Sequence, residues 1–186
     1  SYMFQTAGNE LVAMQAEAMG IPLIIEETSG EKEKELQDLE RAIIKAKQLY
    51  KIGGIVSGAL FSNYQRDRIE KICDKLGLKT FAPLWHKPQL SHLREIINNN
   101  FKVIIMAIAA DGLDESWLGR ELDQKMLEEL ESLKIINYAG EGGEYESLVL
   151  DCPLFNKKIS LTKTKKLMDS SHSGRLIIEQ AELQEK

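Results

Sequence analysis

The sequence predicts an α/β fold: a parallel sheet with helices on both faces, followed by a smaller α+β part. The first reason is that short apolar runs, typical of buried strands, alternate with amphipathic helical segments up to about residue 110. The second reason is a change of pattern after Ala110, where a loop rich in turn residues leads to one helix and several strand-like pieces. We therefore expect two domains, formed by residues 1–110 and 111–186.

The first elements are delimited by glycine and proline. Residues 10–19 are good helix formers, and Gly20 is a typical C-terminal stop. Residues 21–25 form an apolar run with Pro22 near its start, as in a buried strand. Residues 31–51 repeat apolar side chains every three or four positions and place acids in the first turns, which predicts a long amphipathic helix.

The following segments continue the alternation. Strands are expected at 55–56, 78–81 and 102–108, and helices at 63–76 and 91–98. Such an alternation implies parallel strands joined by helical crossovers. The second part should contain a helix over 123–133 and strands at 135–138, 147–150, 158–161 and 176–181.

Composition excludes several classes of protein. Hydrophobic content of 43% and charged content of 28% are ordinary for a soluble globular protein. No apolar run approaches the roughly 18 residues that span a bilayer, and the first residues do not form a secretory signal. Cys73 and Cys152 form no CxxC pair, so we expect a cytoplasmic protein with reduced thiols and no membrane partner. The net charge of −5 makes nucleic acid an unfavourable partner.

The most informative segment is residues 140–147, Gly-Glu-Gly-Gly-Glu-Tyr-Glu-Ser, directly before an apolar run. Glycines permit positive φ angles and let a ligand approach the backbone closely. Carboxylates beside them suit a cation, a metal or an amine nucleophile. The alternative is a purely structural turn, which rarely needs this much negative charge. We therefore interpret the segment as a functional site.

A second candidate site follows the strand at 55–56. The small residues of Ser57-Gly58-Ala59 would let backbone N–H groups face a phosphate at the start of the next helix. An ordinary strand-to-helix turn has the same composition. That helix carries Arg66 and Arg68 in its first turns, where the helix dipole favours acids. The arginines are either ordinary surface residues or ligands of an anion such as phosphate or carboxylate.

Other residues give weaker signals. His86, His92 and His172 lack metal-binding spacing, so surface or packing roles are favoured. Asp114 and Glu115 are candidates to cap a helical turn that contains Trp117, and a functional role of this loop stays open as the alternative. The sequence contains no Walker A motif, no GxGxxG fingerprint and no serine nucleophile elbow.

Three motifs occur in an order and spacing typical of one family. They are Ser57-Gly58-Ala59 with residues 64–70 (Tyr-Gln-Arg-Asp-Arg-Ile-Glu), residues 112–120 (Gly-Leu-Asp-Glu-Ser-Trp-Leu-Gly-Arg) and residues 141–147. Together they resemble the diphthine–ammonia ligase family, a branch of the N-type ATP pyrophosphatases. The resemblance covers essentially the whole chain.

The resemblance implies a HUP-type (Rossmann-like) ATP-binding domain at 1–110 and a substrate-binding domain at 111–186. It also implies a reaction. ATP, with Mg²⁺, would activate the carboxylate of diphthine, a modified histidine on translation elongation factor 2, as an acyl-adenylate. Ammonia would then displace AMP to give the amide. Elongation factor 2 and ammonia are the expected partners, and a homodimer stays open.

The same resemblance implies roles for individual residues. The expected neighbours of the nucleotide phosphates are Ser57, Gly58 and Ala59. The expected substrate-binding residues are Gln65, Arg66, Arg68, Gly142 and Gly143. Glu141 and Glu144 would be catalytic, because a carboxylate pair can both collect ammonium and accept its proton. A magnesium site is the main alternative for the same two residues.

The chain departs from the family pattern at its start. The family opens with a strand and a Ser-Gly-Gly-Lys-Asp-Ser loop that holds the ATP phosphates, and no such stretch occurs here. Without that strand its neighbours would keep unpaired, buried N–H and C=O groups. We therefore interpret the chain as an incomplete part of such a protein and expect it to be inactive alone.

Two other functions remain open from the sequence. One is another adenylating enzyme of the same superfamily, acting on tRNA or on a small carboxylic acid. The other is a nucleotide- or protein-binding module without catalysis. Pyrophosphate release would separate an enzyme from a binding module.

Overall fold

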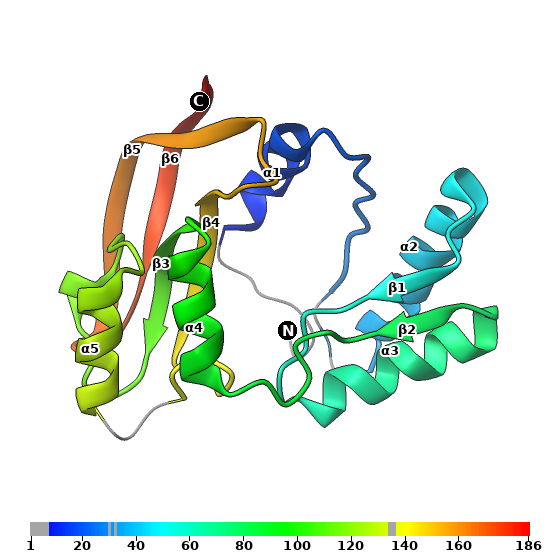
Figure 1. Ribbon diagram of the computed structural model, residues 1–186, viewed down its shortest axis with the longest axis horizontal. Coiled ribbons are helices and arrows are strands. Elements are labelled where there is room, and N and C mark those ends of the chain that lie inside the picture. Colours follow the sequence, from blue (N-terminus) through cyan, green and yellow to red (C-terminus); the bar gives the residue numbers. More distant parts are fainter. Residues whose placement is uncertain (1–7, 30, 32, 134–136) are drawn as a thin grey trace. The chain divides into compact units, whose positions relative to one another are not determined.

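The computed structural model describes residues 8–29, 31, 33–133 and 137–186, which form two compact units. The parallel-sheet unit comprises Leu23–Lys87, and the antiparallel-sheet unit comprises residues 8–22 together with Pro88–Lys186. Figure 1 shows their elements, coloured along the chain. None of the helices described is long and apolar enough to cross a membrane.

The parallel-sheet unit has a simple order of elements. They are α2 (Glu35–Tyr50), β1 (Gly54–Val56), α3 (Asn63–Leu76) and β2 (Lys79–Phe81). β1 and β2 pair in parallel, with Ile55 opposite Thr80. Both helices contribute to one apolar cluster, since Ile43 of α2 and Ile72 of α3 pack together with Leu78. Helix α3 therefore serves as the crossover that parallel pairing requires.

Local signals explain where α3 begins and ends. The Ser62 hydroxyl accepts a hydrogen bond from the Gln65 N–H at 3.3 Å, which satisfies one of the free donors of the first turn. Gly77 ends the helix with a φ of 63°, a left-handed conformation that glycine adopts without strain. The predicted helix over 63–76 is confirmed.

The antiparallel-sheet unit contains the remaining elements. In chain order they are η1 (Asn9–Leu11), α1 (Val12–Met19), α4 (Gln89–Asn98), β3 (Lys102–Ala109), η2 (Glu115–Trp117), α5 (Gln124–Leu133), β4 (Tyr145–Asp151), β5 (Lys157–Ser170) and β6 (Ser173–Glu185). The strand order is β4-β3-β6-β5, and every neighbouring pair is antiparallel. The long β5–β6 hairpin extends well past the three residue pairs that join β6 to β3.

Strand β3 lies at the centre of this unit and is buried on both faces. Val103 and Ile105 belong to the cluster that includes Leu93 of α4 and Leu127 of α5. Ile104 and Met106 belong to a second cluster, which includes Leu11, Ala18 of α1, Leu148 and Ile159. Successive side chains of a strand point to opposite faces, so α1 covers one side of the sheet and α4 with α5 the other (Figure 1).

The α/β class with a following α+β part is confirmed, but the division of the chain differs from the one expected. The expected boundary near residue 110 would leave the strand at 102–108 in a parallel sheet. The structure instead pairs β3 with β4 and β6 and divides the chain between Lys87 and Pro88. A strand that is apolar on both faces indicates burial, and burial alone does not specify the direction of its neighbours.

The strand expected at 21–25 is wrong, because residues 21–29 form neither helix nor strand. Ile21 and Ile25 are 52% and 65% exposed, so this apolar run does not enter a core. Of the strand expected at 135–138, residues 135 and 136 lie outside the described residues. The strands expected at 158–161 and 176–181 are confirmed as parts of the much longer β5 and β6.

Candidate functional site: two loops

The loop that enters β4 has a backbone that requires glycine. Gly140 and Gly143 have φ angles of 72° and 83°. A Cβ atom on Gly140 would lie 2.7 Å from the Tyr145 carbonyl oxygen, closer than real Cβ atoms come. The loop therefore needs glycine at this position for reasons of backbone conformation and of space.

Glu144 is held by three N–H donors. Its Oε1 accepts hydrogen bonds from the Asn137 N–H at 3.1 Å and the Asn137 side-chain amide at 2.6 Å. Its Oε2 accepts from the Gly142 N–H at 2.8 Å. Burial by itself would raise the pKa of Glu144, but the hydrogen bonds, led by the one from the Asn137 side chain, outweigh burial and lower the pKa. The carboxylate is thus ionised at neutral pH.

Two further contacts fix the same loop. Gln89, the first residue of α4, accepts a hydrogen bond from the Ala139 N–H through its Oε1 at 3.0 Å. The Tyr145 hydroxyl donates to the Tyr138 carbonyl oxygen at 2.5 Å. Burial raises the pKa of Tyr145 well above its ordinary value, so this hydroxyl remains a donor.

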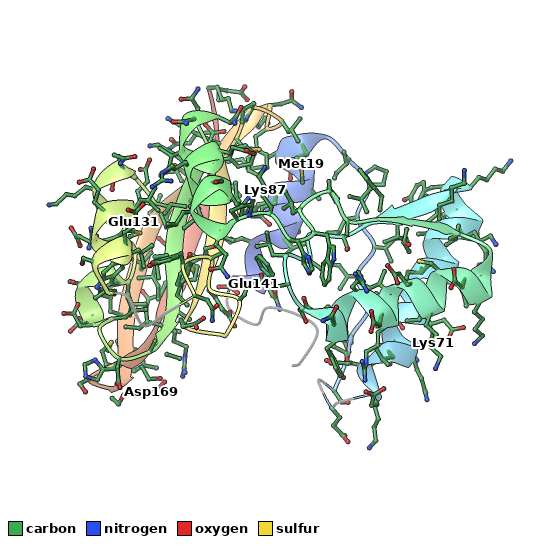
Figure 2. The ribbon with its side chains drawn as sticks, turned by 60° about the horizontal axis from the view of Figure 1, so that its bottom comes forward. Met19, Lys71, Lys87, Glu131, Glu141 and Asp169 are labelled. Atoms are coloured by element: carbon green, nitrogen blue, oxygen red, sulfur yellow. The ribbon has the colours of Figure 1, made fainter. Side chains whose placement is uncertain are left out.

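Glu141 occupies a different environment in the same loop. It is exposed, as are Gly142 and Gly143, whereas Glu144 is half-buried. Figure 2 shows Glu141 on the loop that precedes β4. The structure thus brings Glu141, Gly142, Gly143 and Glu144 together in one loop of the antiparallel-sheet unit. Among the described residues, no group of three or more His, Cys, Asp or Glu side chains is arranged to hold a metal ion.

The small-residue loop lies at the carboxyl ends of β1 and β2 in the parallel-sheet unit. The Ser57 N–H donates to the Phe81 carbonyl oxygen at 3.0 Å, and Ala59 is buried. A Cβ atom on Gly58 would meet no atom within 4 Å. Within the part of the chain that the structure describes, the N–H groups of Gly58 and Ala59 donate to no backbone carbonyl oxygen. Open space and available N–H groups before a helix N-terminus suit an anion such as phosphate.

Both arginines of α3 lie over aromatic rings. The Arg66 guanidinium is 4.2 Å from the centre of the Trp85 ring, and the Arg68 guanidinium is 3.4 Å from that of Tyr64. Arg66 is within 3.2 Å of Asp67 and 3.5 Å of Glu70. Arg68 pairs with Glu33, and this hydrogen bond raises the pKa of Arg68. Carboxylates therefore compensate both arginines at the helix start, and Gln65 contributes its N–H to the Ser62 cap.

The packing role expected for His86 is confirmed, but its partners carried no sequence signal. The His86 ring stacks on Phe61, with ring centres 5.5 Å apart, and on Trp85, at 4.7 Å. The backbone N–H of His86 donates to the Leu60 carbonyl oxygen at 2.8 Å. Gln89 and Asn137 carried no sequence signal, and the contacts of Gln89 join segments far apart in the chain. Of the two candidate caps, Asp114 caps the turn containing Trp117, because its side chain accepts from the Ser116 N–H at 2.9 Å.

The fold and the two loops describe a two-part α/β protein, with one loop suited to an anion and another bearing carboxylates. Comparison with protein families gives two matches. The model of the diphthamide synthase N-terminal domain matches residues 1–80, and that of the diphthamide synthase C-terminal domain matches residues 88–183. The second match begins at residue 88, where the structure also divides the chain.

Individual relatives are similar over nearly the whole chain. The diphthine–ammonia ligase of Homo sapiens is 38% identical over 185 residues, which cover 92% of this chain and 69% of the relative. That of Danio rerio is 38% identical, covering 91% of this chain and 72% of the relative. That of Saccharomyces cerevisiae is 31% identical, covering 95% of this chain and 30% of the relative. The chain belongs to the diphthine–ammonia ligase family.

Proposed function

We propose that this protein catalyses the ATP-dependent amidation of diphthine by ammonia, the last step of diphthamide synthesis. The observation that carries the proposal is the 38% identity to diphthine–ammonia ligases over 92% of the chain. Matches to both diphthamide synthase domains, in the same order along the chain, support it.

The chemistry divides into two steps. A carboxylate does not react with ammonia until it carries a good leaving group. ATP supplies that group: the diphthine carboxylate attacks the α-phosphate, an acyl-adenylate forms and pyrophosphate leaves. Ammonia then attacks the acyl carbon, AMP leaves, and one proton must pass from the attacking nitrogen to a base.

The parallel-sheet unit is proposed to hold the nucleotide. The loop of Ser57, Gly58 and Ala59 fits this role, since the N–H groups of Gly58 and Ala59 precede the N-terminus of α3 and the space beside Gly58 is open. Gln65, Arg66 and Arg68 would bind anionic groups of the substrates. For the arginines this means exchanging Asp67, Glu70 or Glu33 for the incoming anion. Mg²⁺ would enter with the phosphates of ATP.

The loop before β4 is proposed to handle ammonia. Ammonia is mostly ammonium near neutral pH, so Glu141 and Glu144 would concentrate it, and one carboxylate of the pair would accept its proton. Gly142 and Gly143 carry no side chain that would keep the substrate from the backbone. The diphthine would arrive on translation elongation factor 2, which makes the cytoplasm the proposed location.

The test combines two products of one reaction. The protein, produced with any residues that its gene encodes before Ser1, is incubated with ATP, Mg²⁺, ammonium chloride and elongation factor 2 that carries diphthine. We expect pyrophosphate release that depends on the factor, and conversion of its diphthine carboxylate to the amide, measured by mass spectrometry. Factor whose diphthine is already amidated is the matched control. Pyrophosphate release with tRNA or a small carboxylic acid instead would assign another reaction, and nucleotide binding without turnover would indicate a binding module.

A further inference from the structure

A chain of hydrogen bonds joins the start of α4 to the carboxylate loop. Gln89 Oε1 accepts from the Ala139 N–H at 3.0 Å, and Gln89 Nε2 lies 3.4 Å from Asn137 Oδ1. Asn137 Nδ2 in turn donates to Glu144 Oε1 at 2.6 Å. Gln89 lies in α4, whereas Asn137 lies shortly before the glutamates in the loop that enters β4. Together they contact Ala139 and Glu144.

We infer that Gln89 and Asn137 are positioning residues, which hold Glu144 as the anchor of the loop and leave Glu141 as the carboxylate that handles ammonia. The inference rests on the proposed amidation and assigns different tasks to its two glutamates.

The direction of each hydrogen bond determines the next one. The Ala139 N–H needs an acceptor, so the oxygen of the Gln89 carboxamide must face it. The Gln89 nitrogen then faces Asn137, which turns the Asn137 oxygen toward α4 and its nitrogen toward Glu144. Reversing either amide would place two acceptors or two donors against each other. The orientation of the Glu144 carboxylate is therefore set from α4.

The surroundings of the two glutamates favour this division of tasks. The Glu144 oxygens together receive three N–H groups, and protonating this carboxylate would weaken at least one of those bonds. A Cβ atom at position 142 would lie 2.5 Å from Glu144 Oε1, so Gly142 makes room for the carboxylate inside the loop. Glu141 is exposed on the same loop, where a small cation can reach it.

Two substitutions remove single donors with little change of shape. Asn137→Asp replaces the amide that donates to Glu144 by a carboxylate that repels it. Gln89→Glu keeps an acceptor for the Ala139 N–H but offers no N–H to Asn137. Asn98→Asp and Gln180→Glu, which are exposed on α4 and β6, make the same chemical changes away from the loop and serve as controls.

We expect the KM for ammonia to rise about tenfold in Asn137→Asp and about threefold in Gln89→Glu, as for residues that orient a functional group. Diphthine-dependent exchange of pyrophosphate into ATP should change less than about twofold, because the loop acts after adenylation. The double variant should resemble Asn137→Asp alone, because both residues act through one chain of hydrogen bonds. An equal loss of exchange and amide formation, or additive effects on the KM for ammonia, would overturn the inference.

A second measurement does not depend on activity. The side-chain carboxyl signal of Glu144 is followed by NMR as the pH is lowered. In Asn137→Asp it should titrate at higher pH than in the unsubstituted protein, and unchanged titration would overturn the inference. If the unsubstituted protein shows no pyrophosphate exchange at all, the proposed function fails, while this titration still decides whether Asn137 positions Glu144.

Discussion

At the scale of single residues, Gly140 is required by two separate features of the structure. Its φ of 72° strains any side-chain-bearing residue, and a Cβ atom would press against the Tyr145 carbonyl oxygen. We expect Gly140→Ala to lower the free energy of unfolding of the antiparallel-sheet unit by about 2–4 kcal/mol. Urea unfolding followed by the fluorescence of the buried Trp117, in a Trp85→Phe background, measures the change.

A substitution at Gly143 distinguishes the effect of the positive φ angle from the effect of the Cβ contact. Its φ is 83°, but a Cβ atom there would meet no atom within 4 Å. Gly143→Ala should therefore cost only the backbone conformation, about 1–2 kcal/mol. Equal losses for the two variants would show that contact with the Tyr145 carbonyl oxygen is unimportant.

The anchoring of Glu144 makes the loop sensitive to acid. Hydrogen bonds from Asn137 and Gly142 lower the pKa of Glu144, so they stabilise the folded loop fully above the ordinary glutamate pKa of 4.5. That stabilisation is lost as the pH falls below this value and through the lowered pKa. Backbone amide NMR signals of Asn137 and Gly142 should therefore shift together in acid. In Glu144→Gln this shared shift of the two signals in acid should disappear, because glutamine has no carboxyl group to protonate.

Glu141 is expected to affect only the second half of the reaction. Glu141→Gln keeps the size of the side chain but removes the negative charge that attracts ammonium and accepts its proton. Amide formation should fall about 100-fold, within the range for loss of a general base, while diphthine-dependent pyrophosphate exchange stays close to normal. Glu10→Gln, at an exposed position of η1, is the control. Equal losses in both steps would contradict an ammonia-handling role.

Composition predicted a site at these glutamates but did not indicate their partners. The prediction rested on three glycines and three acids within residues 140–146. The role of Gln89 depends on contacts with residues 48 and 50 positions away in the chain. A single sequence gives no indication of such contacts, because any exposed helix start accepts glutamine.

At the scale of elements, the cap of α3 connects helix stability to the small-residue loop. Ser62 ends that loop and accepts from the Gln65 N–H. Ser62→Ala should destabilise the parallel-sheet unit by about 1 kcal/mol and weaken ATP binding, because the loop loses its fixed end. Hydrogen exchange of the first amides of α3 and ATP titration calorimetry measure the two effects. Ser91→Ala, inside α4, should change neither.

The helices were predictable from sequence because their signals are local. Caps, glycine stops and apolar spacing lie within each segment, and α2, α3, α4 and α5 occur close to the predicted ranges. Strand pairing depends on distant segments instead. β3 is apolar at successive positions because two separate clusters cover it, one per face. The same pattern is typical of a central parallel strand. This explains why the parallel direction predicted for β3 was wrong.

At the scale of the whole molecule, the antiparallel-sheet unit takes residues from two distant parts of the chain. Leu11 and Ala18 are 4% and 0% exposed and belong to the cluster on one face of the sheet. The cut expected at residue 110 separates β3 from its sheet partners. A piece that begins at residue 88 keeps the sheet but lacks η1 and α1. The whole core is contained in residues 8–22 together with residues 88–186.

Because the core is built from these two segments, we can predict how separate pieces of the chain behave. Residues 88–186 alone would expose Ile104, Met106 and Leu148 on one face of the sheet, and such an apolar patch favours aggregation. Joining residues 8–22 to residue 88 through a flexible glycine–serine linker should restore a soluble, cooperatively unfolding protein. Sedimentation and thermal unfolding by circular dichroism compare the two. A third piece, with Leu11 and Ala18 both changed to Asp, should behave like residues 88–186 alone, because a charge at either position cannot be buried without a partner. Equal solubility of all three pieces would show that η1 and α1 do not belong to this core.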